Sequence, residues 1–163
     1  MKVIFSHGKE SGPHGSKIER LAAVAKESGH QGKSLDYTGI FDPDVRVEIL
    51  LDALKGEREG VLLVGSSMGG YVSLVAAEQV AVAGIFLLAP ALYLPGYAKQ
   101  DYLCNHPHIE IVHGWSDDVV PPANSIRFAK YADCSLHLIR GDHRLNSSLN
   151  VVEKLFRQFL DDE

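Results

Sequence analysis

The sequence predicts an α/β fold: a three-layer α/β/α sandwich around a six-stranded, mostly parallel sheet. Short runs rich in β-branched and aromatic residues alternate with segments of helical periodicity, which is the order of βαβ units. The runs at 61–65 and 85–88 show no polar alternation, as is typical of strands buried on both faces. The chain has 163 residues, 45% of them hydrophobic, and can bury a core without metals or disulfides.

Each predicted strand is too short for a stable helix and is bounded by Gly, Pro or polar residues. The six strands are expected at 2–6, 33–37, 61–65, 84–89, 108–113 and 135–140. Because helical segments separate them, we expect parallel pairing with right-handed crossovers.

The helices are predicted mainly from apolar residues spaced three and four apart. Asp42 followed by Pro43 is typical of a helix start, and Asn146 or Ser147 could cap the last helix. Residues 68–79 are apolar nearly all round, and Pro121-Pro122 would open a shorter helix through 130. The apolar stripes are Ile18, Leu21, Ala22 and Ala25; Val47, Leu50, Leu51 and Leu54; and Val152, Leu155, Phe156 and Phe159.

One long irregular segment, 90–107, follows a predicted strand and contains three prolines. Long loops in compact domains often act as lids or binding loops. The segment is therefore a candidate lid or substrate loop, with Tyr93 and Tyr97 as candidate substrate-binding residues. No linker or repeat interrupts the chain, so we expect one domain over residues 1–163.

Composition argues against several classes of partner. Sixteen Lys and Arg against 21 Asp and Glu give a net charge of −5, and no basic cluster offers a nucleic-acid surface. The longest apolar stretches, 61–65 and 84–92, are too short to span a membrane, and the N-terminus lacks the apolar core of a signal peptide. Two cysteines without C-x-x-C spacing fit a reducing compartment, so we expect a cytoplasmic protein, although one disulfide stays open. A homodimer also stays open, because apolar residues on the last helix could be core or interface.

The strongest local motif is Gly65-Ser66-Ser67-Met68-Gly69-Gly70, which contains G-x-S-x-G centred on Ser67. A buried strand is expected to end just before the motif and an apolar helix to begin at 68. A serine on such a sharp turn projects from the carboxyl edge of the sheet as a candidate nucleophile. A plain glycine-rich turn is the alternative interpretation. Ser66 fits less well, because the pattern centred on it fails at Val64.

A nucleophilic serine needs a base, and the base needs an acid to orient it. His143 follows the sixth predicted strand on a short loop at the same edge, and an imidazole pKa of about 6.5 suits a general base. Asp117 and Asp118 follow the fifth strand, and either could be the acid. A serine, an aspartate and a histidine each follow the carboxyl end of a different predicted strand. This combination is far less expected by chance than any single motif.

Donors for an oxyanion are expected from two backbone amides. Met68 follows the candidate nucleophile, and Lys9 follows Gly8 in the loop after the first strand. That loop does not fit the spacing of a phosphate-binding motif. His7 and His14 lack a carboxylate or thiol to complete a metal site, so we expect neither a metal nor an organic cofactor.

With these motifs in place, the whole chain resembles the α/β-hydrolase superfamily. The resemblance rests on His7-Gly8, the Ser67 motif, His113-Gly114-x-x-Asp117-x-x-Val120-Pro121 and Gly141-Asp142-His143. It implies Ser67 as nucleophile, Asp117 rather than Asp118 as acid, and His143 as base. It also implies a sheet in the order 2-1-3-4-5-6, without the two leading strands of the family and without a cap domain, as in small bacterial hydrolases.

The resemblance implies a serine hydrolase that cleaves a small carboxylic ester or thioester, with a small-molecule acyl compound as its partner. Trp115, on the acid loop, is a third candidate for the substrate pocket. A non-catalytic member of the same fold that binds a partner is the alternative. A flavodoxin-like binding domain shares the strand order but would need a phosphate loop after the first strand.

Overall fold

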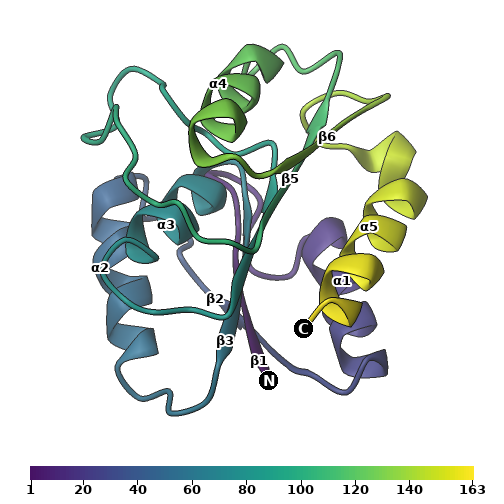
Figure 1. Ribbon diagram of the computed structural model, residues 1–163. Helices are drawn as coiled ribbons and strands as arrows, with labels where there is room; N and C mark the ends of the chain where they lie inside the picture. The colour runs from purple at the N-terminus through teal and green to yellow at the C-terminus, as the bar shows by residue number, and fades with distance from the viewer.

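The computed structural model describes all 163 residues and contains one six-stranded sheet, in which all strands run parallel (Figure 1). The order across the sheet is β2-β1-β3-β4-β5-β6, which confirms the predicted class and order. The strands are β1 (Lys2–Ser6), β2 (Gln31–Leu35), β3 (Val61–Ser66), β4 (Gly84–Leu88), β5 (Ile109–Gly114) and β6 (Ser135–Ile139).

Helices cover both faces of the sheet. Figure 1 shows α1 and α5 together on one side, while α2 and α3 pack on the other and α4 lies beside β5 and β6. The helices are α1 (Ser16–Glu27), α2 (Pro43–Leu54), α3 (Met68–Ala76), α4 (Pro122–Ala132) and α5 (Leu149–Asp161), with a short 3₁₀ turn at Asn146–Ser148.

The core lies in two apolar clusters, one on each face of the sheet. Every residue of β3 and β4 is buried, as their unbroken apolar runs predict. Successive side chains of β3 enter opposite clusters, since Leu62 and Val64 pack against α1 and α5 while Leu63 packs against α2 and α3. The central strands are thereby fixed from both sides, and their carboxyl ends hold the loops described below.

Several boundaries differ from the sequence predictions. β2 covers Gln31–Leu35 rather than 33–37, because the Asp36 side chain accepts a hydrogen bond from the Thr38 amide and turns the chain. The helix expected over 68–79 ends at Ala76. Neither Asn146 nor Ser147 caps α5, because both lie in the 3₁₀ turn that precedes it.

The segment 90–107 contains neither helix nor strand, as expected. Hydrogen bonds tie it to α2, to α3 and to the turn after α3: the Ala98 amide donates to Asp44, the Lys99 amide to the Tyr71 hydroxyl, and the Leu103 amide to Glu78. Both cysteines are free thiols, and no helix combines the length and apolar character that a membrane span requires.

Candidate active site

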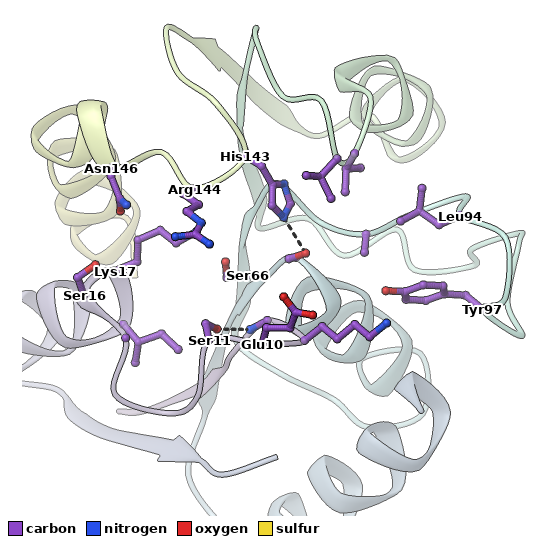
Figure 2. A pocket seen from close by; sticks show the side chains of 18 residues that line it. Glu10, Ser11, Ser16, Lys17, Ser66, Leu94, Tyr97, His143, Arg144 and Asn146 are labelled. Atoms are coloured by element: carbon purple, nitrogen blue, oxygen red, sulfur yellow. Dashed lines mark hydrogen bonds between the residues drawn. The ribbon is translucent and has the colours of Figure 1, made fainter. Parts of the chain in front are cut away.

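Loops at the carboxyl edge of the sheet enclose a cavity of about 620 Å³ (Figure 2). Ser67 and His143 line it together with the loop after β1 and the first residues of α1. A cavity of this size lies in the usual range for small-molecule sites, and the carboxyl edge is where open α/β sheets bind ligands.

The turn between β3 and α3 holds Ser67 in a rarely populated backbone conformation, with φ 55° and ψ −117°. The glycines around it are required by close backbone approach. A Cβ on Gly65 would lie 2.2 Å from the Gly69 carbonyl oxygen, and one on Gly69 would lie 1.9 Å from that of Ser6. The motif therefore forms a tight strand–turn–helix junction that presents Ser67 to the cavity.

Ser67, His143 and Asp117 form one chain of hydrogen bonds. The Ser67 hydroxyl lies 3.0 Å from His143 Nε2, the contact drawn as a dashed line from His143 in Figure 2. His143 Nδ1 lies 2.8 Å from Asp117 Oδ2. With the proton on Nδ1, His143 donates to the carboxylate and accepts from the serine. This arrangement can draw the hydroxyl proton from Ser67 onto His143.

The Asp117 carboxylate is buried and receives four polar contacts. Its Oδ1 accepts hydrogen bonds from the amides of Val119 at 2.9 Å and Val120 at 2.8 Å. Its Oδ2 lies between His143 Nδ1 and His113 Nε2, with the second contact at 3.1 Å. Neighbouring Asp118 is exposed and makes no side-chain hydrogen bond. Only Asp117, of the two aspartates that the sequence leaves open, reaches the base.

His113 lies behind Asp117 and is completely buried. Its Nε2 donates to the Val120 carbonyl, 2.9 Å away, so its Nδ1 accepts from the Ser125 hydroxyl at 2.7 Å. Burial lowers the pKa of His113 and outweighs the Val120 carbonyl and Asp117, which act in the opposite direction. His113 is therefore a neutral imidazole whose Nε2 contacts the carboxylate from the buried side.

The loop after β1 lies against the serine turn. A Cβ on Gly8 would be 3.6 Å from Ser67 Cβ, an ordinary van der Waals contact, so the loop packs directly beside Ser67. The amides of Lys9 and Met68 make none of the hydrogen bonds found in the loops and helix caps, which leaves both N–H groups free to donate. Their placement beside Ser67 fits donors to an oxyanion.

A buried arginine that was not predicted from the sequence is hydrogen-bonded to the loop after β1. Arg46 is fully buried on α2 and donates to the carbonyl oxygens of His7, Gly8 and Lys9. The signal available was its position four residues before Leu50, on the apolar face of the helix.

The three predicted substrate residues have different positions. Tyr97 lines the cavity, whereas Tyr93 and Trp115 do not. The Tyr93 ring packs edge-on to Tyr102. The Arg127 guanidinium carbon lies over the Tyr93 ring, 3.9 Å from the ring centroid. The Trp115 side chain is 62% exposed. Chain order placed both near the site but could not determine the direction of their side chains.

Several cavity residues were not expected from the sequence. They are apolar Ala91, Leu94, Val119 and Val120 and polar Lys17, Arg144 and Asn146. The only cluster with potential metal ligands, His108, Glu110 and Asp162, lies at the start of β5, at the opposite edge of the sheet.

Comparisons with known proteins agree with this architecture. A sequence model of the "Alpha/beta hydrolase family" matches residues 11–160, while a comparison with curated proteins gave no match. The fold is similar to that of a protein from Xanthomonas campestris assigned to the alpha/beta hydrolase superfamily. The TM-score is 0.91 at 29% identity, over 99% of each chain.

Two further solved structures share the fold at lower identity. Est1E from Butyrivibrio proteoclasticus has a TM-score of 0.80 at 20% identity, over 99% of this chain and 87% of that one. The ydeN gene product from B. subtilis has a TM-score of 0.79 at 21% identity, over 98% of each chain.

Proposed function

The chain belongs to the alpha/beta hydrolase family and is in general terms a hydrolase, and on that basis we propose that it cleaves small carboxylic esters or thioesters through an acyl-enzyme on Ser67. The observation that carries this proposal is the unbroken series of contacts from Ser67 to His143 to Asp117. A protein that uses the fold only to bind a partner has no need of a serine, a base and an acid at such distances.

In the first step, Ser67 Oγ attacks the carbonyl carbon of the ester while His143 Nε2 takes the hydroxyl proton. Asp117 keeps the other imidazole proton on Nδ1 and stabilises the imidazolium. The carbonyl oxygen becomes an oxyanion, to which the amides of Lys9 and Met68 donate. Loss of one such donor typically lowers turnover about 10²- to 10³-fold.

The tetrahedral intermediate then collapses. The bond to the leaving alcohol or thiol breaks, and His143 gives its proton to that group. Water enters, His143 Nε2 takes a proton from it, and the resulting hydroxide attacks the acyl carbon. The second intermediate releases the carboxylic acid as His143 returns the proton to Ser67 Oγ. Every proton moves through one imidazole nitrogen, and no further reactant is needed.

The apolar side of the cavity suits a small acyl group. Ala91, Leu94, Val119 and Tyr97 provide methyl groups and one aromatic ring beside Ser67. Burial of such a group removes its apolar surface from water, which stabilises the complex by roughly 25 cal/mol per Å².

The test is hydrolysis of short-chain aryl esters and acyl thioesters by the wild type, Ser67→Ala and Ser66→Ala. We expect the wild type and Ser66→Ala to turn over at least one of these substrates, and Ser67→Ala to lose that turnover. Ser66 is the matched control because it is the adjacent serine and also lines the cavity. Equal turnover by wild type and Ser67→Ala would contradict the proposal. Absence of turnover in correctly folded wild type would favour the binding protein.

A further inference from the structure

The cavity has two chemically different sides. Figure 2 shows Leu94 and Tyr97 on one side of the hydrogen bond from His143, and Lys17 and Arg144 on the other. The first side presents apolar side chains, and the second carries two positive charges. Lys9 and Glu10 also line the cavity and bring one charge of each sign. The mechanism above uses no charge of this kind, so the second side calls for an explanation of its own.

Neither cation has a partner within the protein. The ion pairs of the chain include neither Lys17 nor Arg144, and the side chains of both donate no hydrogen bond. Other cations of the chain, such as Arg20, Lys99 and Arg157, do pair with carboxylates. Lys17 and Arg144 are therefore free to bind an anion, whereas Lys9, the third cation of the lining, lies over the Phe41 ring.

Lys17 is also partly buried, which disfavours its charged form. Burial lowers the pKa of Lys17 to about 8, and the nearby Arg144 charge acts in the same direction. Asp117 and Asp142 raise it but do not compensate. An anionic group beside these two cations would relieve both effects, because it would replace lost water and offset their mutual repulsion.

Neighbouring groups are compatible with an anion. Lys17 lies in the first turn of α1, where the helix dipole favours negative charge, and no side chain caps that end of the helix. Asn146 adds an amide to the cavity wall. The two acids that act on Lys17 are committed elsewhere. Asp117 accepts from the Val119 and Val120 amides, and Asp142 Oδ1 accepts from the Arg144 and Leu145 amides. Glu10 lines the cavity but forms no ion pair.

We propose that the substrate carries a negatively charged group, a carboxylate or a phosphate, and that Lys17 and Arg144 bind it while Ser67 attacks the acyl carbon. This inference rests on the proposed function and narrows its substrate class to anionic esters and thioesters. The apolar side of the cavity then holds the uncharged part of the same molecule.

The test uses two fluorophosphonates that are the same size, one ending in a carboxylate and the other in the corresponding carboxamide. The second-order rate constant for modification of Ser67 is measured for each by mass spectrometry, in the wild type, Lys17→Gln, Arg144→Gln and Lys26→Gln. Lys26→Gln is the matched control, because it removes one charge from the exposed last turn of the same helix.

We expect the ratio of the rate constants, charged over neutral, to fall about tenfold or more in Lys17→Gln and in Arg144→Gln, the usual loss for one hydrogen bond to a charged group. It should stay unchanged in Lys26→Gln. A ratio that is the same in all four proteins would overturn the inference and leave the proposed function standing. Failure of both probes to modify Ser67 in folded wild type would overturn both.

Discussion

Two histidines contact the same oxygen of Asp117, and their surroundings give them different capacities. His143, on the loop after β6, lines the cavity and has Ser67 on its other nitrogen. His113, at the end of β5, is completely buried and has Ser125 on its other nitrogen. Both are imidazoles within hydrogen-bond reach of one carboxylate.

The comparison shows that the partner and the exposure of the second ring nitrogen determine what each histidine can do. A proton that moves onto His143 comes from a group that a substrate can reach. A proton on both nitrogens of His113 would leave a charge in the core, which burial disfavours. We therefore assign proton transfer to His143 and positioning of the carboxylate to His113.

The largest expected effect comes from the carboxylate that both histidines share. Asp117→Asn should lower kcat by about 10⁴-fold, because the amide favours the wrong tautomer of His143. Asp118→Asn, its exposed neighbour, should leave kcat nearly unchanged. The measurement is steady-state hydrolysis of an ester that the wild type accepts, and the reverse order of the two variants would move the acid to Asp118.

The second effect separates positioning from proton transfer. His113→Leu removes the contact of Nε2 with Asp117 Oδ2 and should lower kcat by up to about 10²-fold, as expected for a displaced functional group. His113→Gln, whose amide can donate in the same direction, should recover part of that loss. His143→Gln should recover nothing, because an amide cannot take the serine proton. Equal recovery at both positions would contradict the assignment.

The third effect is on stability and distinguishes a neutral buried imidazole from an exposed one. The pKa of His113 is lower in the folded than in the unfolded chain, so below pH of about 6.5 the unfolded chain binds a proton that the folded protein excludes. The free energy of unfolding should therefore fall as pH decreases below about 6.5, by at most roughly 1.4 kcal/mol per unit from this group.

Urea unfolding at pH 7.5 and pH 5.5 measures this effect. The decrease should be smaller in His113→Gln than in the wild type. His7, whose pKa is also lowered by burial, is present in both proteins, so the difference reports His113. The same decrease in both proteins would show that His113 takes up its proton in the folded state.

The smallest effect concerns Trp115, on the loop between β5 and α4 that also carries Asp117. Trp115 directly follows β5 but is exposed and does not line the cavity. Trp115→Ala should leave kcat/KM nearly unchanged, as usual for an exposed side chain. Tyr97→Ala should raise KM, because it removes an aromatic wall of the cavity. A marked loss of kcat/KM in Trp115→Ala would place that side chain against the bound substrate.

Sequence patterns were sufficient for the α/β class and for bringing Ser67, His143 and the Asp117-Asp118 pair to one edge of the sheet. These features depend on local chemistry, such as the glycines of a tight turn, or on the rule that parallel strands end at one edge. The strand order and the choice of Asp117 over Asp118 came from the family resemblance. The patterns were weaker for β2, an edge strand whose first three residues are exposed and polar or small.

Features that depend on side-chain direction could not be predicted. Lys17 looks like an ordinary surface cation of an amphipathic helix, and only the packed structure brings it to the cavity. Tyr93 is the opposite case. It lies in the segment 90–107, where substrate contacts were expected, but its ring packs against Tyr102 and does not line the cavity.

The most direct test of an activated Ser67 is reaction with a neutral fluorophosphonate, followed by peptide mapping, in the wild type, Ser67→Ala and Asp117→Asn. We predict stoichiometric modification of Ser67 in the wild type, none in Ser67→Ala, and much slower modification in Asp117→Asn. Modification at another residue, or equal rates in the wild type and Asp117→Asn, would contradict the roles assigned to Ser67, His143 and Asp117.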